Sequence, residues 1–252
     1  MRLRIIFYAN KDLVLPLHYN HMIQKNIYDL LDFDYSSFLH DKGFEYDNRR
    51  FKLFTFSKLV VENKDIKKDK IIIKKGQVNL TIATIDERFI FSIIRGLLKR
   101  KKFVFHEGEL NVEEVYARKD TKFNKLVALT ISPVVVKKYS VDKMDDFYKI
   151  HDEIFIEKIK ENLLKKYFAY YNRKYDNELS IEILDKNRTK KVVDFYKKFP
   201  IEGYLAGFVL KGEKDILDIA YSCGIGNKNS QGFGCIEKID EINKFDNYIK
   251  VL

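Results

Sequence analysis

The sequence predicts an α+β protein made of two tandem ferredoxin-like domains, each with the element order βαββαβ. Three observations predict this class. Strand-like and helix-like stretches follow that order along the first half of the chain, and the same order recurs along the second half. The chain has 252 residues, 46% of them hydrophobic, which suits two small cores at about 100–200 residues per domain.

The first half opens on a stretch that alternates apolar and polar side chains, as a half-buried strand does. Pro16 then stands where a first helical residue is expected, ahead of an apolar stripe at helical spacing. A second helix has acids in its first turn and bases in its last. The predicted elements are a strand at 2–8, a helix at 16–31, strands at 51–57 and 71–85, a helix at 86–100 and a strand at 102–118.

The second half repeats this order without any repeat of the sequence itself. A long amphipathic stretch predicts its first helix, and a shorter one runs directly into a glycine-rich segment. The predicted elements are a strand at 125–138, a helix at 145–171, strands at 179–184, 190–196 and 203–212, a helix at 213–224 and a strand at 232–239.

The boundary between the two domains is expected near residues 118–124, which divides the chain into 1–122 and 123–252. No linker rich in proline, glycine or serine occurs there. We therefore expect the two domains to pack rigidly against each other.

The charge balance indicates a polyanionic partner. Lysine and arginine total 47 against 37 acids, a formal net charge of +10. Nucleic acid and an anionic membrane surface both fit that balance. No apolar run approaches the ~18 residues of a membrane span, and the first residues do not form a signal peptide. We expect a soluble cytoplasmic protein without membrane contact, whose Cys223 and Cys235 are reduced, although a disulfide between them could close the segment that they flank.

That segment, "GIGNKNSQGFG" at 224–234, is the first candidate site. A P-loop needs a lysine after the second glycine and a helix directly behind it, and a dinucleotide fingerprint needs a strand before and a helix after. Here a helix precedes and a strand follows. Glycines that only supply a tight connection are an equally good interpretation. The polar tip suits a sugar-phosphate backbone, so the candidate RNA-binding residues are Gly224, Gly226, Asn227, Lys228, Asn229, Ser230, Gly232 and Gly234.

The segment resembles the C-terminal glycine-rich motif of the RAMP superfamily of CRISPR proteins. The first half makes the resemblance more specific, because "LPLHYNHMIQKNIYDLL" followed by "FLHDKGFEYDNRRFKLFTFS" is similar to the start of the CRISPR repeat-processing endoribonucleases, the sixth Cas family. The resemblance runs essentially from end to end. It implies cleavage of a CRISPR precursor RNA inside each repeat by a 2′-hydroxyl, without a metal ion or cofactor, leaving a 2′,3′-cyclic phosphate and a 5′-hydroxyl.

The resemblance carries three catalytic residues over to this chain: His40 in "FLHDKG", Tyr28 in "NIYDLL" and Lys52 in "RFKLFTFS". Their chemistry fits the reaction, which needs a base, an acid and positive charge on the phosphorane. Histidine is the natural base near neutral pH. The acid and base roles of Tyr28 and His40 stay open, as does any contribution from His18 or His21.

Plainer interpretations exist for each residue and for the whole chain. A solvated loop histidine, an interface tyrosine and a strand-end lysine would look the same at these positions. A non-catalytic RAMP subunit of a CRISPR effector complex would share the fold and the glycine segment, and so would a general RNA-binding module. The expected partners are CRISPR repeat RNA, as precursor and product, and subunits of an effector complex. The protein itself is expected to be a monomer or a homodimer.

Overall fold

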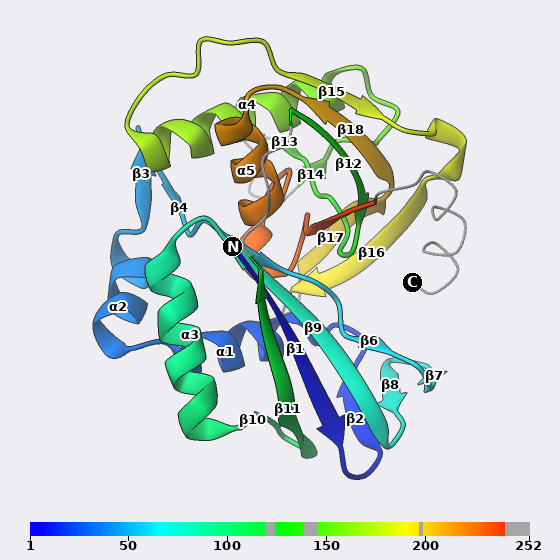
Figure 1. The fold of residues 1–252 in the computed structure, drawn as a ribbon. Coiled ribbons are helices and arrows are strands. Elements are labelled where there is room, and N and C mark those ends of the chain that lie inside the picture. The colour runs from blue at the N-terminus through cyan, green and yellow to red at the C-terminus, as the bar shows by residue number, and fades with distance from the viewer. Residues whose placement is uncertain (119–123, 139–145, 197–198, 240–252) are drawn as a thin grey trace.

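The computed structural model describes residues 1–118, 124–138, 146–196 and 199–239. Two antiparallel sheets, one from each half of the chain, form the framework (Figure 1). Within the described ranges no helix is both long and apolar enough to span a membrane.

The first sheet has the strand order β10-β11-β1-β9-β5, with β6 also paired to β9. Its bounds are β1 Arg2–Ala9, β5 Phe54–Phe56, β6 Val60–Val61, β9 Gly76–Thr84, β10 Lys102–Phe105 and β11 Gly108–Arg118. Strand β1 lies in the centre and pairs antiparallel with both β9 and β11. If β1, β5, β9 and β11 are counted as first to fourth, their spatial order is fourth, first, third, second.

The second sheet has the order β15-β18-β12-β19. Its bounds are β12 Lys125–Thr130, β15 Ser180–Ile183, β18 Gly207–Lys211 and β19 Ile236–Lys238. Counted in the same way, these strands again lie in the order fourth, first, third, second, with every pairing antiparallel. The predicted fold class, two tandem ferredoxin-like units, is confirmed.

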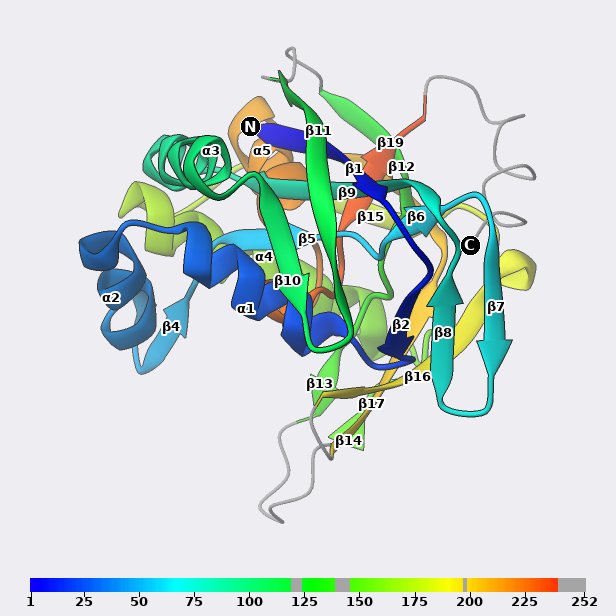
Figure 2. The same ribbon diagram turned by 90° about the horizontal axis from the view of Figure 1, so that it is seen from below.

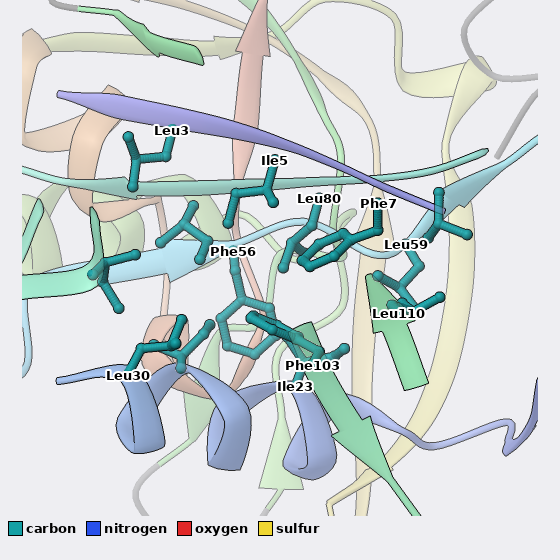
Figure 3. Close-up of a cluster of buried hydrophobic side chains, with 14 of the residues drawn as sticks. Leu3, Ile5, Phe7, Ile23, Leu30, Phe56, Leu59, Leu80, Phe103 and Leu110 are labelled. Atoms are coloured by element: carbon teal, nitrogen blue, oxygen red, sulfur yellow. The ribbon is translucent and has the colours of Figure 1, made fainter. Parts of the chain in front are cut away.

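Each sheet packs against two helices. Helices α1 Asn20–Leu30 and α3 Glu87–Arg100 accompany the first sheet, and α4 Ile154–Tyr171 and α5 Lys214–Cys223 accompany the second (Figure 1). Figure 3 shows the first core, in which Ile23 and Leu30 of α1 face side chains from β1 and its neighbours. Fully burying an aliphatic or aromatic side chain of this kind contributes about 1.5–3 kcal/mol.

The predicted first helix begins too early. Pro16 does not open it but ends a strand, β2 Leu13–Pro16, which pairs with β8 Lys70–Ile73. Proline has no N–H to donate and is tolerated at a strand end. Strand β8 in turn pairs with β7 Lys64–Lys67 to form a hairpin. The predicted strand at 71–85 is therefore two strands, β8 and β9. The β7–β8 hairpin lies at the periphery beside β6 (Figure 2).

The polar connection ahead of β5 also contains structure. A short helix, α2 Phe33–Asp41, is followed by the two-stranded hairpin β3 Phe44–Tyr46 and β4 Arg49–Phe51. The predicted strand at 51–57 is interrupted at Leu53, whose φ of 50° lies in the left-handed region. The predicted strand at 102–118 is also a hairpin, β10–β11, because Gly108 begins a new strand.

In the second half, several predicted elements are divided. The predicted strand at 125–138 is β12 followed by a loop and β13 Lys137–Lys138, which pairs with β14 Asp146–Phe147. The long helix starts at Ile154, later than predicted. The predicted strand at 203–212 bends at Ala206, so that β17 Phe199–Leu205 pairs with β16 Lys190–Tyr196 while β18 enters the main sheet. The predicted domain boundary falls among residues 119–123, outside the described residues.

The two halves meet through buried polar contacts. Arg2 of β1 is 4% exposed, and its guanidinium donates to the carbonyl oxygens of Tyr221 and Ile236 at 2.8 and 2.7 Å. The same guanidinium stacks over the Tyr221 ring at 4.0 Å. Leu53, although it belongs to the first half, packs in the hydrophobic core of the second. These contacts hold the ends of α5 and β19, and therefore the segment between them, against the first half.

Candidate RNA-cleavage site

One polar face of α1 contacts the glycine-rich segment 224–234, which we call the glycine loop. Asn20 Nδ2 donates to the carbonyl oxygens of Gln231 and Gly232 at 2.9 and 3.2 Å, and Gln24 Nε2 donates to that of Ser230 at 2.8 Å. Residues four apart share a helix face, so Tyr28 lies one turn beyond Gln24 on the side that meets the loop. The fold thus brings residues from opposite ends of the chain together.

The glycines of the loop are required by its backbone. Gly224, Gly226, Gly232 and Gly234 all have φ between 68° and 83°, a region that other residues rarely adopt. A Cβ at Gly234 would lie 2.0 Å from the Ile225 carbonyl oxygen. These φ values and close contacts fit the interpretation of the glycines as a tight connection. The role of the same glycines in RNA binding stays a prediction.

The polar residues at the tip of the loop are of two kinds: some have side chains that bond within the protein, and the others are partly exposed. Asn229 faces inward, where its Nδ2 donates to the carbonyl oxygens of Ile225 and Phe233 at 3.1 and 3.0 Å. The side chain of Asn227 is also used within the protein, because its Oδ1 accepts from the backbone N–H of Lys137 at 2.9 Å. Lys228, with a left-handed φ of 60°, and Ser230 are partly exposed beside the pocket described next.

The loop tip forms one wall of a pocket of about 330 Å³, which we call the loop pocket. The opposite walls come from the segment between β4 and β5 and from α4. Lys52 lines this pocket together with loop residues, so the structure brings one predicted catalytic residue to the predicted RNA-binding loop. The lining residues are Arg49, Arg50, Phe51, Lys52, Leu53, Phe54, Asn162, Lys166, Cys223, Gly226, Asn227, Lys228, Asn229 and Ser230.

Lys52 reaches the pocket because the backbone turns sharply behind it. Leu53 is only 3% exposed and its left-handed backbone directs its side chain into the core of the second half. The ammonium of Lys52 donates to the carbonyl oxygen of His40 at 3.0 Å. Partial burial, with a smaller effect from Arg50, lowers the pKa of Lys52 below its usual value.

His40 lies in the last turn of α2, where its backbone meets Lys52 and its side chain faces solvent. That side chain is 83% exposed, and its Nδ1 lies 2.8 Å from Asp41 Oδ1. A carboxylate at this distance accepts from Nδ1–H and leaves Nε2 to accept a proton. The structure thus connects His40 to Lys52 through the main chain and leaves its imidazole accessible.

Tyr28 approaches the same region from α1. Its ring meets that of Phe54, a residue of the loop pocket, edge to face at a centroid distance of 6.1 Å. Burial, with a smaller effect from Tyr196, raises the pKa of Tyr28 to about 12. The hydroxyl therefore keeps its proton at neutral pH and can donate it or donate a hydrogen bond.

Sequence reasoning missed Lys166, which supports the loop from beneath. This α4 side chain is 2% exposed, and its Nζ donates to the carbonyl oxygens of Gly224 and Gly226 at 2.7 and 3.2 Å. Burial lowers its pKa to about 7. A signal was present, because Lys166 falls on the same apolar stripe of the predicted helix as Ile159 and Leu163.

A second missed group surrounds the start of α1. Lys58 and His18 both contact the buried carboxylate of Asp194, His18 through Nδ1 at 2.7 Å. Lys58 also donates to Asn20 Oδ1 at 2.7 Å, so the group ties the β16–β17 hairpin to the helix that holds the glycine loop. His21 Nδ1 lies 3.0 Å from the His18 carbonyl oxygen, a local structural contact.

In the part of the chain that the structure describes, no group of three or more histidine, cysteine or acidic side chains could hold a metal ion. Cys223 and Cys235 are free, buried thiols. Burial raises the pKa of both thiols, to about 12 and about 11.

Two ferredoxin-like units with a glycine loop against a basic pocket define a protein of the RAMP type. Two family models match this chain: "CRISPR-associated protein Cas6, N-terminal" over residues 14–116 and "CRISPR associated protein Cas6, C-terminal" over residues 116–238. The chain is 30% identical to "CRISPR-associated endoribonuclease Cas6 1" of Methanocaldococcus jannaschii, over 99% of this chain and 97% of that protein. The chain belongs to the Cas6 family of CRISPR-associated endoribonucleases.

Solved structures agree with this assignment. One described as "CRISPR associated protein Cas6" superimposes with a TM-score of 0.78 at 26% identity, covering 95% of this chain and 99% of the other. A second, described as "An RAMP protein binding different RNA substrates", gives a TM-score of 0.79 at 25% identity and covers 95% and 100%.

Proposed function

We propose that this protein cleaves CRISPR precursor RNA within its repeats by a metal-independent reaction. The observation that carries the proposal is the loop pocket, which Lys52, whose ammonium contacts the turn bearing His40, lines together with the glycine loop. The name of the Methanocaldococcus jannaschii relative and the RNA-binding description of a similar structure support it. Repeat RNA is then the substrate and the cleaved repeat the product.

The chemistry of the three predicted catalytic side chains supports the following reaction. The 2′-oxygen attacks the adjacent phosphorus while His40 takes its proton, the bond from phosphorus to the 5′-oxygen breaks, and Tyr28 donates a proton to that oxygen. The products are a 2′,3′-cyclic phosphate and a 5′-hydroxyl. Lys52 stabilises the negative charge that develops on the phosphorane oxygens. With its pKa raised to about 12, Tyr28 stays protonated at neutral pH and so holds a proton to donate.

The proposal also includes the division into domains 1–122 and 123–252. Lys52 comes from the first and the glycine loop from the second, so the loop pocket needs both. Subunits of an effector complex, a cytoplasmic location and a monomeric or homodimeric state remain predictions from the sequence.

A second candidate function is that of a non-catalytic RNA-binding subunit. The observation that favours it is the His40 imidazole, which is 83% exposed and contacts Asp41 rather than a group of the pocket. A subunit of this kind would keep the glycine loop and bind repeat RNA without cutting it.

The test is cleavage of a repeat RNA by the purified protein in excess EDTA. We expect one discrete cut with a cyclic-phosphate end. His40→Ala should lower the single-turnover rate at least 100-fold and leave the Kd for RNA nearly unchanged, because the residue acts on the transition state. His106→Ala removes another exposed histidine and should behave as wild type.

Binding without cutting by the wild-type protein would favour the non-catalytic subunit. An equal loss of rate and affinity in His40→Ala would show that this residue binds RNA rather than acting in the reaction.

A further inference from the structure

Gln24 of α1 joins the glycine loop to the β16–β17 hairpin through its side-chain amide. On one side its Nε2 donates to the Ser230 carbonyl oxygen at 2.8 Å. On the other side its Oε1 contacts the hydroxyl of Tyr196, the last residue of β16. Ser230 lines the loop pocket, whereas Tyr196 does not. One side chain therefore links a tyrosine outside the pocket to the loop tip that forms its wall.

The chemistry of the two partners determines how the Gln24 amide is oriented. A carbonyl oxygen can only accept, so the amide nitrogen must face Ser230. The amide oxygen then faces Tyr196, and two oxygens in contact need a proton between them, which the hydroxyl supplies. Burial raises the pKa of Tyr196 above its ordinary value, so this proton is retained at neutral pH. The tyrosine hydroxyl is therefore a donor that selects one orientation of the amide.

A second amide on the same face of α1 is held in the same way. Asn20 Nδ2 donates to two carbonyl oxygens of the glycine loop, and its Oδ1 accepts from the Lys58 ammonium at 2.7 Å. Lys58 also contacts the buried carboxylate of Asp194 on β16. Both amides that hold the loop thus have their oxygens fixed by a separate donor, and strand β16 takes part in both arrangements.

The ring of Tyr196 is placed against the glycine loop by packing. It lies on a small cluster of buried side chains that includes Val135 and Phe233, the latter from the loop itself. Val135 also supports the loop through its carbonyl oxygen, which accepts from the Asn227 N–H at 2.7 Å. The protein core therefore sets the position of the Tyr196 hydroxyl before any RNA is bound.

We infer that Tyr196 is a positioning residue for the cleavage reaction, acting through Gln24 on the tip of the glycine loop. The inference rests on the proposed function. Ser230 of the loop tip and Lys52 line the same pocket, so the hold on the tip sets its place relative to the predicted phosphate-binding cation. Tyr28, the predicted proton donor, lies one helical turn beyond Gln24. A misplacement of about 1 Å in such a site can cost about 100-fold in rate.

The experiment is a double-mutant cycle of Tyr196→Phe and Gln24→Leu with two readouts. The first readout is single-turnover cleavage of repeat RNA. Tyr196→Phe keeps the ring and should lower the rate about tenfold while the Kd for RNA changes less than about twofold, because only the geometry of the bound complex is altered. The double variant should be no slower than Gln24→Leu, because the hydroxyl then has no amide to orient.

The second readout is hydrogen exchange of loop amides in the protein without RNA. The N–H groups of Gln231 and Gly232 donate to carbonyl oxygens within the loop tip at 2.9 Å. Tyr196→Phe should raise their exchange rates about tenfold, because a loop that has lost a contact opens more readily. The double variant should again match Gln24→Leu.

Tyr175→Phe is the matched control. This half-buried tyrosine also has a hydroxyl that contacts backbone groups, the Glu178 carbonyl oxygen at 3.1 Å and the Glu213 N–H at 3.0 Å. These contacts lie at the start of α5, and the glycine loop follows its other end. Tyr175→Phe should cleave RNA and exchange loop amides as wild type does.

A second variant covers the case in which Tyr196→Phe does not fold, as judged by its melting transition. Gln24→Glu keeps an oxygen that accepts from Tyr196 but has no N–H for the Ser230 carbonyl oxygen. Its cleavage rate should fall and its loop amides should exchange faster. Wild-type values for both would overturn the inference.

Three results of the cycle would also overturn the inference. Unchanged exchange in Tyr196→Phe would show that the hydroxyl does not hold the loop tip, and faster exchange with an unchanged cleavage rate would show that this hold has no part in the reaction. Rate losses that add in the double variant would mean that the hydroxyl acts on RNA or on Tyr28 directly. If the wild-type protein cuts no repeat RNA, the proposed function fails, and hydrogen exchange still decides whether Tyr196 positions the loop.

Discussion

Lys166 illustrates what one buried side chain can do for a loop. The residue is 2% exposed, and its ammonium donates to two carbonyl oxygens of the glycine loop. A lysine charge without a carboxylate partner is costly to bury, and its pKa falls as a result. The benefit is a fixed point of attachment beneath a loop whose backbone has a left-handed φ at several positions.

We predict that Lys166 makes stability depend on pH. Its pKa is about 7 in the folded protein and 10.5 is its ordinary value, so between these values the unfolded chain binds a proton that the folded protein does not. Stability should therefore rise with pH in this window, by up to about 1.4 kcal/mol per pH unit.

Urea unfolding of wild type and Lys166→Met, measured from pH 7 to pH 9, tests this prediction. As the pH rises, the free energy of unfolding of wild type should increase relative to that of the variant. Parallel pH profiles for the two proteins would contradict it.

At the scale of elements, the glycine loop is a rigid connection between α5 and β19. We predict that Gly234→Ala destabilises the protein by about 2 kcal/mol or more, because it combines a left-handed φ of 68° with a Cβ placed 2.0 Å from the Ile225 carbonyl oxygen. Thermal unfolding measures the loss.

Gly212→Ala is the matched control for this prediction. Its φ lies outside the left-handed region, and the atom nearest to the added Cβ is the Ile216 side-chain Cγ2 at 3.1 Å. Similar melting temperatures for the two variants would show that the loop can rearrange around Gly234.

The sequence predicts the main elements well and the short ones poorly. In strands such as β1 and helices such as α3, apolar and polar residues repeat at the spacing of a strand or a helix. Such a repeat can be recognised from neighbouring residues alone. Strand β7 is exposed along its whole length and three of its four residues are charged, so little in its pattern separates it from a loop. Strand β2 depends on pairing with β8, more than fifty residues away, and such pairing is invisible to a local pattern.

The residues of the candidate site also differ in how well the sequence predicts them. Resemblance to a family and residue chemistry select Tyr28, His40 and Lys52, whose catalytic roles stay predictions. Neither selects Lys166, because its contacts depend on how α4 packs against a loop far along the chain. Lys52 reaches the pocket only because Leu53 adopts a left-handed backbone, a conformation that no leucine signals in a sequence.

At the scale of the whole molecule, the net charge of +10 favours electrostatic attraction to RNA. The tip of the glycine loop is one predicted point of contact. Phosphate contacts of this kind set affinity and its salt dependence, whereas bases and shape set specificity.

We predict that Lys228→Ala weakens repeat-RNA binding and makes the plot of log Kd against log salt concentration shallower by about one phosphate contact. Lys64→Ala, on exposed strand β7, is the control and should leave the slope unchanged. Binding titrations at several salt concentrations measure both. A wild-type slope in Lys228→Ala would remove this residue from the phosphate contacts.

The exposure of His40 has a consequence for how such an enzyme would choose its targets. An imidazole that projects into water and meets the exposed carboxylate of neighbouring Asp41 is not directed at the loop pocket. The bound RNA must then position its own ribose beside the His40 imidazole. The folded structure of the repeat would therefore contribute directly to catalysis. Unrelated RNA would then bind to the basic surface without being cut. Cellular transcripts would stay intact even if the protein bound different RNAs with similar affinity.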